Sequence, residues 1–377
     1  MPPNHAYLPV YQCMLLVDYK NGKGESIAVR VRIILLASKK VLTMLSLYFQ
    51  NKVRIEMSRI PRYAVIDGKR QPPPSCPSLM RNAMNFEPEK DDIFVVAYPK
   101  CGTTLVTQIV ALILRNGETF TTPSEYFSFI PFLEFTTTAE ISKIPKPRCF
   151  KTHLPLNLLN LSGEARYIYV ARNPADCLVS HYHHARFFPI YFFSDGTLDQ
   201  MFELFIKGEV ESDDYFDHLL SGYERRNEPN TLFLTYESIL ADRRGACLQI
   251  ARFLGEDHYK NLLKNDEAVL KRVMEYSSME HMKSTVDGFF KKQFSSIPPE
   301  ELQMANPVLK NLAELVRETL RKGERSIGSF VRKGKVGEGK VSLSEDQLKK
   351  LSDRIKEKTA HSDVMSLWNE IYFVQRI

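Results

Sequence analysis

The chain has 377 residues, of which 44% are hydrophobic and 25% charged, and its formal net charge at pH 7 is +6. These values are typical of a globular protein with one large domain and an appendage, and the charge suits an anionic small-molecule ligand. No basic stripe interleaved with aromatic residues is present, which argues against nucleic-acid binding.

The cysteine pattern argues against two further kinds of site. The six cysteines are scattered without a Cys-x-x-Cys pair, so we expect neither a zinc site nor a disulfide framework. A reducing compartment fits this pattern best, and we expect a cytoplasmic protein. The cysteines are Cys13, Cys76, Cys101, Cys149, Cys177 and Cys247.

Residues 1–56 form an N-terminal extension. Its apolar patches, RIILLA and VLTMLSLYF, are interrupted by basic residues, well short of the roughly 20 apolar residues that a membrane-spanning helix needs. Its first residues also lack the basic region and apolar core of a secretory signal. We therefore expect no membrane span, and we expect residues 57–377 to form a single domain to which the extension is optional, with Met57 as an alternative start.

The stretch DDIFVVAYPKCGTTLVTQIVALIL, residues 91–114, places a strand, a short turn and a helix end to end. Ile93–Ala97 is a continuous apolar run, as expected for a strand buried on both faces of a parallel sheet. Apolar residues then recur at helical spacing as far as Leu114. The free N–H groups at the start of this helix, with Lys100 and the flexible Gly102, predict a site for phosphate or sulfate.

A purely structural turn is the alternative. Most strand–turn–helix units in α/β proteins bind nothing, and the Gly-x-x-x-x-Gly-Lys-Ser/Thr spacing of nucleoside triphosphatases is absent here. The turn by itself does not decide between the two interpretations.

Apolar strand-like runs alternate with helical patterns along the rest of the chain. This alternation predicts an α/β fold with a doubly wound parallel sheet. Ligands of such sheets bind beyond the carboxyl ends of the strands, where we expect Lys100, His153, Arg172 and Tyr236. The predicted strands are 148–153, 166–171 and 230–237, and the predicted helices are 174–187 and 238–254.

Three further segments have less specific patterns. Residues 67–77 are expected to be extended. Residues 295–328 form a polar excursion with one amphipathic helix, for which a mobile lid and an ordinary solvated insertion are both open. In residues 342–359, Ser344 is placed to cap a structural helix that carries apolar residues on one face.

Four motifs, in order, resemble those of the cytosolic sulfotransferases. They are YPKCGTTL at 98–105, FKTHLPL at 150–156, YVARNPADCLVSHYHH at 169–184 and FVRKGKVGEGK at 330–340. The resemblance covers roughly residues 60–345. It implies a P-loop-like turn that binds the donor 3′-phosphoadenosine 5′-phosphosulfate, with a small-molecule phenol, alcohol or amine as acceptor.

The resemblance also implies roles for individual residues. Lys100, Cys101, Gly102, Thr103 and Thr104 would hold the 5′-phosphosulfate, and Arg172, Ser180, Arg332, Lys333 and Gly334 would hold the 3′-phosphate. Tyr236 and Ser277 match positions that contact the adenine or a nearby phosphate, and Leu105 and Met279 match the positions that flank the adenine.

The chemistry of sulfuryl transfer assigns the catalytic roles. His153 would be the base that accepts the proton of the acceptor, while Lys100 and Lys151 would stabilise charge on the sulfuryl and bridging oxygens, with Ser180 beside them. No metal is required. A metal site at His181 and His184, one helical turn apart, is the weaker alternative, because no third ligand is evident.

Several positions depart from the family pattern. Leu105 and Met279 replace the aromatic residues that enclose the adenine, and Glu338 and Gly339 replace Asp-Trp in the last motif. The family dimer element is altered, so we regard the usual homodimer as doubtful. The altered element has Lys340, Ser344, Glu345 and Lys349 at its defining positions.

Two other functions stay open. A carbohydrate sulfotransferase of the secretory pathway would use the same donor, and a catalytically weak nucleotide-binding module would fit the loss of the aromatic pair. We also expect Cys101, next to Lys100 and a helix N-terminus, to have a lowered thiol pKa and to be readily alkylated.

Overall fold

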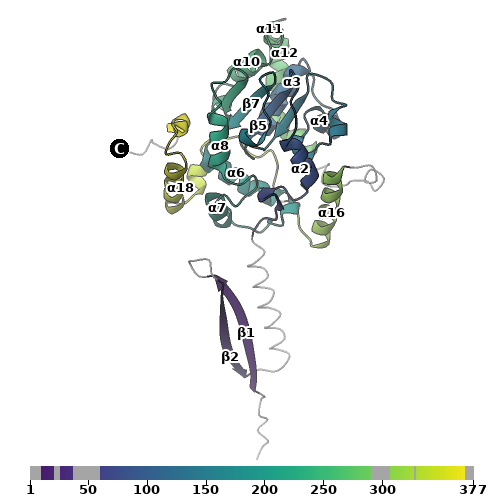
Figure 1. Ribbon diagram of the computed structural model, residues 1–377. Helices are drawn as coiled ribbons and strands as arrows, with labels where there is room; N and C mark the ends of the chain where they lie inside the picture. Colours follow the sequence, from purple (N-terminus) through teal and green to yellow (C-terminus); the bar gives the residue numbers. More distant parts are fainter. Residues whose placement is uncertain (1–9, 21–25, 37–59, 290–305, 327, 370–377) are drawn as a thin grey trace, which may run out of the picture. The chain divides into compact units, whose positions relative to one another are not determined.

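The computed structural model describes residues 10–20, 26–36, 60–289, 306–326 and 328–369 (Figure 1). It divides into two compact units, Met1–Ser58 and Arg59–Ile377. In the first unit, β1 (Val10–Lys20) and β2 (Ser26–Leu36) pair antiparallel with Val10 opposite Leu36 and Lys20 opposite Ser26. That the first unit is optional stays a prediction.

The second unit is built on a four-stranded parallel sheet with the strand order β6-β5-β7-β8. β5 and β7 lie at its centre, and every residue of β5 is buried, as its continuous apolar run predicts (Figure 1). This confirms the expected α/β fold. The strands are β5 (Ile93–Ala97), β6 (Cys149–Thr152), β7 (Arg166–Ala171) and β8 (Thr231–Thr235).

The strand order creates a switch point between β5 and β7. The chain passes from β5 to β6 on one side of it, and then to β7 and β8 on the other side. Ala97 pairs with Val170, so both strands end at the same level. In open α/β sheets such a point, beyond the carboxyl ends of the strands, is the usual place of a ligand.

Two helices leave this edge of the sheet. α3 (Thr103–Leu114) follows β5 through the short turn, and α6 (Pro174–Phe187) follows β7. The Asn173 side chain caps α6 by accepting hydrogen bonds from the N–H groups of Ala175 and Asp176. The bounds of α6 and of β7 are those predicted from the sequence.

Further helices surround the sheet and continue to the C-terminal part. They are α2 (Pro77–Met84), α4 (Pro123–Phe129), α5 (Thr138–Ile141), α7 (Leu198–Ile206), α8 (Tyr215–Tyr223), α9 (Tyr236–Ala241), α10 (Arg243–Leu254), α11 (Glu256–Leu263), α12 (Ala268–Tyr276), α13 (Met279–Ser284), α16 (Pro307–Arg321), α17 (Glu338–Ser342) and α18 (Glu345–Lys358), with 3₁₀ turns at Leu133–Phe135, Leu156–Leu158, Pro189–Tyr191 and Val364–Trp368.

Three expectations need correction. The strand predicted at 230–237 is shorter in the structure, because β8 ends at Thr235. The Thr235 hydroxyl accepts a hydrogen bond from the Ser238 N–H and so caps α9, which begins at Tyr236. The helix predicted at 238–254 is interrupted at Asp242, which caps α10 by accepting from Gly245. The extended segment 67–77 contains β4 (Lys69–Gln71), which pairs with β3 (Ala64–Ile66), and the start of α2.

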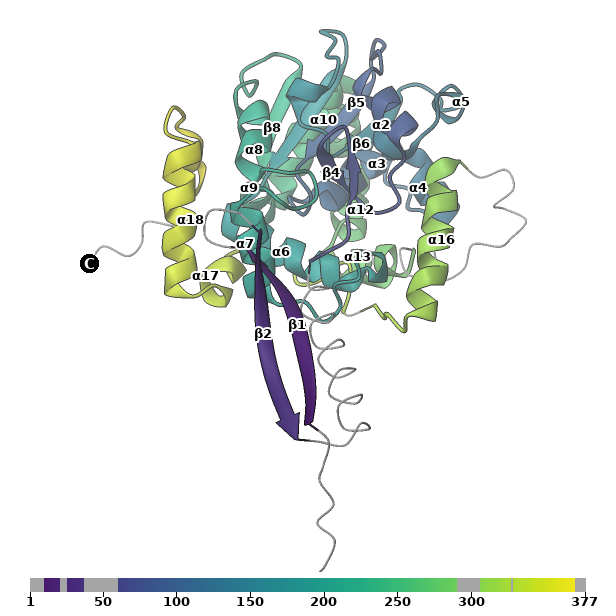
Figure 2. The same cartoon turned by 60° about the horizontal axis from the view of Figure 1, so that its bottom comes forward.

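Both predicted C-terminal helices are present. Figure 2 shows α16 and α18 on opposite sides of the second unit. Ser344 caps α18 by accepting the Gln347 N–H, as expected. α16 is the amphipathic helix of the polar excursion, and residues 295–305 of the same excursion lie outside the described residues.

Candidate active site

The turn after β5 is shaped for close approach of a ligand. Lys100 and Gly102 have φ of +71° and +107°, and only glycine adopts the second conformation readily. A Cβ at Gly102 would lie 2.7 Å from Cδ2 of Tyr236. The turn therefore requires glycine here, and it directs the first N–H groups of α3 toward the switch point.

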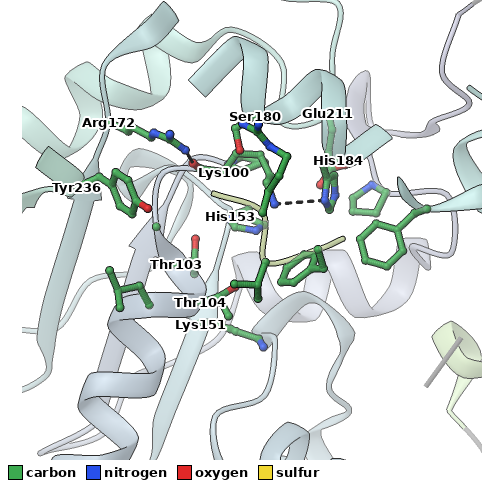
Figure 3. A pocket seen from close by; sticks show the side chains of 18 of the residues that line it. Lys100, Thr103, Thr104, Lys151, His153, Arg172, Ser180, His184, Glu211 and Tyr236 are labelled. Carbon is green, nitrogen blue, oxygen red and sulfur yellow. Dashed lines mark hydrogen bonds between the residues drawn. The ribbon is translucent and has the colours of Figure 1, made fainter. Parts of the chain in front are cut away.

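Arg172 joins the two central strands at this point. Its Nη1 donates to the carbonyl oxygen of Lys100 at 3.1 Å, its Nη2 donates to that of Lys335 at 3.4 Å, and its guanidinium lies 4.5 Å from the ring centre of Tyr236. Within the described residues, Arg172 Nε and the hydroxyl of Thr103 are buried without a hydrogen-bond partner. Buried polar groups without a partner are rare, and these two fit an anionic ligand that would satisfy them (Figure 3).

His153 is held as a neutral imidazole. Its Nδ1 donates to the carbonyl oxygen of Ala97 at 2.6 Å, which leaves the lone pair on Nε2. Burial lowers the His153 pKa to about 4. Glu134 holds the segment by accepting from the His153 N–H at 2.7 Å and from the Thr152 hydroxyl at 2.9 Å.

Two lysines supply positive charge around this histidine. Burial lowers the pKa of both Lys100 and Lys151 to about 8, so both are mainly protonated at pH 7. The Lys151 ammonium lies 4.6 Å from the ring centre of Phe132. Both lysines line the cavity, and within the described part of the chain neither forms an ion pair.

A chain of hydrogen bonds, not anticipated from the sequence, leads from Lys100 to a buried carboxylate. Tyr191 donates its hydroxyl to Glu211, so its oxygen can accept from His184 Nε2 at 3.4 Å. His184 Nδ1 then accepts from the Lys100 ammonium at 3.5 Å (Figure 3). Burial raises the pKa of Glu211 to about 7. No local pattern marks Glu211, because its place depends on packing between segments far apart in the sequence.

The fourth sequence motif, residues 330–340, reaches the cavity because its backbone is hydrogen-bonded to α6. Asp176 accepts the N–H groups of Gly337 at 2.8 Å and of Gly339 at 2.6 Å. A Cβ at Gly339 would lie 2.4 Å from the Ala175 backbone, so α17 packs directly on α6. This contact brings Arg332, Lys333 and Gly334 to the wall of the cavity.

One cavity brings together fourteen of the sixteen site residues that the sequence predicted. They are Lys100, Gly102, Thr103, Thr104, Leu105, Lys151, His153, Arg172, Ser180, Tyr236, Met279, Arg332, Lys333 and Gly334. Glu134, Glu211, Tyr191 and Glu338 line it as well.

Cys101 and Ser277 are the exceptions, because neither lines this cavity. The Ser277 hydroxyl is used inside the protein, donating to the Val273 carbonyl oxygen at 2.6 Å and accepting from Arg243 at 3.2 Å. Cys101 is fully buried, with its sulfur 3.7 Å from that of Cys177. Burial raises the Cys101 thiol pKa, so the expectation of a lowered pKa and a readily alkylated thiol is wrong.

The alternative of a histidine metal site gains no support. Both ring nitrogens of His181 are buried without a partner among the described residues, while His184 contacts Lys100 and Tyr191. The described residues contain no group of three histidine, cysteine, aspartate or glutamate side chains that could hold a metal ion. They also contain no helix long and apolar enough to cross a membrane.

Comparison with known proteins places this site in a family. A family model described as "Sulfotransferase domain" matches residues 90–363. Human sulfotransferase 1C2 is 32% identical over 269 residues, which cover 68% of this chain and 79% of that protein. The amine sulfotransferase of rabbit is 31% identical over 296 residues, or 77% of this chain and 88% of that protein.

Solved structures agree with this match. Mouse sulfotransferase SULT7A1 complexed with PAP aligns with a TM-score of 0.61 and 26% identity over 82% of this chain and 98% of that one. Retinol dehydratase in a complex with retinol and PAP aligns with a TM-score of 0.52 and 25% identity, over 75% of this chain and 85% of that one. The chain therefore belongs to the cytosolic sulfotransferase family and is a sulfotransferase that depends on 3′-phosphoadenosine 5′-phosphosulfate.

Proposed function

We propose that the enzyme transfers the sulfuryl group to a hydroxyl or amine of a small molecule by in-line attack, with His153 as general base. One observation carries the proposal: the Nδ1 hydrogen bond to Ala97 leaves the Nε2 lone pair of His153 for the acceptor, in the cavity that Lys100 and Lys151 also line. A positioned neutral histidine is the usual base for such a proton.

The proposed donor site extends along the edge of the sheet. The turn residues Lys100, Gly102, Thr103 and Thr104 would hold the phosphosulfate, supported by the partnerless Thr103 hydroxyl and the N-terminus of α3. Cys101 would serve by its small size rather than by its thiol. Leu105 and Met279 would contact the adenine through apolar surface, and Arg172, Ser180, Arg332, Lys333 and Gly334 would surround the 3′-phosphate.

The donor supplies an activated sulfuryl group, and the protein supplies orientation and charge. The Lys100 and Lys151 ammonium groups would stabilise the charge that develops on the sulfuryl and bridging oxygens. Their burial strengthens this effect, because charges interact more strongly where water is excluded. His153 Nε2 would accept the acceptor proton as the oxygen or nitrogen attacks sulfur.

An apolar acceptor fits the remaining wall of the cavity. That wall is largely aromatic and aliphatic, which favours a small apolar or aromatic molecule over an oligosaccharide. The names of two similar proteins, amine sulfotransferase and retinol dehydratase bound to retinol, support acceptors of this size. The wall includes Phe132, Phe135, Phe188, Ile190, Met282 and Phe330.

Transfer of radiolabelled sulfate from the donor to a panel of phenols, alcohols, amines and oligosaccharides would test the function. We expect label on at least one small molecule and none on oligosaccharides, and the Lys151→Met protein should lose the transfer. Label on oligosaccharides only would favour the carbohydrate enzyme. Binding of 3′-phosphoadenosine 5′-phosphate without any transfer would favour a nucleotide-binding module.

A further inference from the structure

The two cations of the last motif are already paired with a carboxylate. Arg332 Nη1 donates to Glu338 Oε1 at 2.5 Å, and Arg332 Nη2 donates to Glu338 Oε2. Lys333 Nζ donates to Glu338 Oε1 at 2.9 Å. These are the side chains that the proposed function assigns to the 3′-phosphate, and the inference below rests on that assignment.

The pairing has the geometry of phosphate recognition. A guanidinium binds a carboxylate and a phosphate with the same kind of fork of two parallel N–H groups, so a phosphate that used the Nη1 and Nη2 groups of Arg332 would have to displace Glu338 from them. The hydrogen bonds from Arg332 lower the Glu338 pKa to about 2, so its carboxylate is ionised at neutral pH. His183, whose pKa is lowered to about 4 by burial, adds no charge beside the pair at that pH.

Glu338 is held in this place by the backbone on both sides. It is the first residue of α17, and the backbone N–H groups of its neighbours Gly337 and Gly339 both donate to the Asp176 carboxylate of α6. The Glu338 side chain is only 11% exposed and lines the cavity together with Arg332 and Lys333. The carboxylate is thus part of the cavity wall rather than a loose surface group.

We propose that the Glu338 carboxylate competes with the nucleotide for Arg332 and Lys333. It accepts hydrogen bonds from both cations until the 3′-phosphate of a nucleotide displaces it. Glu338 therefore determines by how much the 3′-phosphate increases the affinity of the protein for a nucleotide. The opposite role is that of a positioning residue: Glu338 would orient both cations for the phosphate and strengthen binding.

Titration calorimetry with two nucleotides separates these roles. Adenosine 5′-phosphate lacks the 3′-phosphate, and 3′-phosphoadenosine 5′-phosphate carries it. We expect Glu338→Gln to tighten binding of the second nucleotide roughly ten- to a hundredfold, the usual range for a hydrogen bond to a charged group, and to change binding of the first by less than about twofold.

Glu345→Gln is the matched control, because Glu345 is the exposed first residue of α18 and the substitution changes the net charge equally. We expect it to leave both affinities unchanged. Glu338→Asp keeps the charge and shortens the side chain by one methylene group, so it should tighten binding less than Glu338→Gln. Because the charge of Glu338→Asp is unchanged, any tightening in this variant would show that the effect depends on contact with the cations and not on charge alone.

Unchanged or weaker binding of 3′-phosphoadenosine 5′-phosphate to both Glu338 variants would overturn the proposal, and weaker binding would identify Glu338 as a positioning residue. An equal gain for both nucleotides would also overturn it, because the effect would then not involve the 3′-phosphate. If the wild-type protein bound neither nucleotide, the proposed donor site would fail instead. Thermal unfolding of each variant shows whether it is folded in the titration.

Discussion

At the scale of single residues, His153 is set up to be neutral at every pH near 7. Its Nδ1 hydrogen bond orients the ring, and burial keeps its pKa at about 4. The histidine can therefore act as a base without first losing a proton. This differs from an exposed histidine, which is largely protonated below about pH 6.5.

We predict that His153→Ala lowers kcat by about 10²–10⁴-fold, the usual contribution of a general base, and leaves donor affinity within about threefold. His361→Ala, at an exposed histidine, is the control. Steady-state kinetics and nucleotide titration would measure both effects. An equal loss of donor affinity, or an unchanged kcat, would contradict the role of His153 as base.

Glu211 should make stability depend on pH. Its pKa is raised to about 7 in the folded protein, so the folded state binds this proton more tightly than the unfolded state does. Stability from this group is therefore present below about pH 4.5 and is lost as the pH rises to about 7. The loss is on the order of 3 kcal/mol.

We predict that Glu211→Gln raises the free energy of unfolding at pH 8 and changes it little at pH 5, because glutamine does not ionise. Urea unfolding at both pH values would measure this difference. Glu224→Gln, at an exposed position, should show no such dependence. If Glu211→Gln and wild type had the same pH profile, the carboxyl would not be proton-bound near neutral pH.

At the scale of elements, the turn between β5 and α3 carries the donor site through its backbone. Gly102 lies in the left-handed region and packs against the Tyr236 ring, which itself covers Arg172. A side chain at this position would have to move Tyr236 and would hold the turn in an unfavourable conformation.

We predict that Gly102→Ala destabilises the protein by about 1–3 kcal/mol and weakens nucleotide binding at least tenfold. Gly163→Ala is the matched control, because no atom lies within 4 Å of its added Cβ. Urea unfolding and titration calorimetry would measure the two effects. Wild-type affinity in the Gly102→Ala protein would show that the turn does not contact the nucleotide.

At the scale of the whole molecule, the site belongs to the unit Arg59–Ile377. Every residue that lines the cavity lies between Gln71 and Glu338. The strands, the helices and the last motif that build the cavity are all in this unit.

We predict that a protein beginning at Met57 folds and keeps its sulfotransferase activity within about twofold of the full chain. Circular dichroism, thermal unfolding and the label-transfer assay would compare the two proteins. An insoluble or inactive shortened protein would show that residues 1–56 contribute to the fold or to the site.

The sequence alone predicted the local elements that carry the site. Ile93–Ala97 is an apolar run rich in β-branched and aromatic residues, as is typical of a buried strand, and the bounds of β5 match it. Pro174, preceded by the capping Asn173, marks the start of α6, which also ends as predicted. These features are set by propensity and capping within a few residues, so a short window of sequence contains them.

Only the tertiary structure decided which side chains meet. The Cys101 thiol is buried beside Cys177 of α6, and this burial raises its pKa. Glu211 belongs to the site because Tyr191 and His184 link it to Lys100. Contacts between residues far apart in the chain depend on how the elements pack, and burial then sets the pKa values. No local pattern contains that information, so the chemistry of these groups became visible only in the folded molecule.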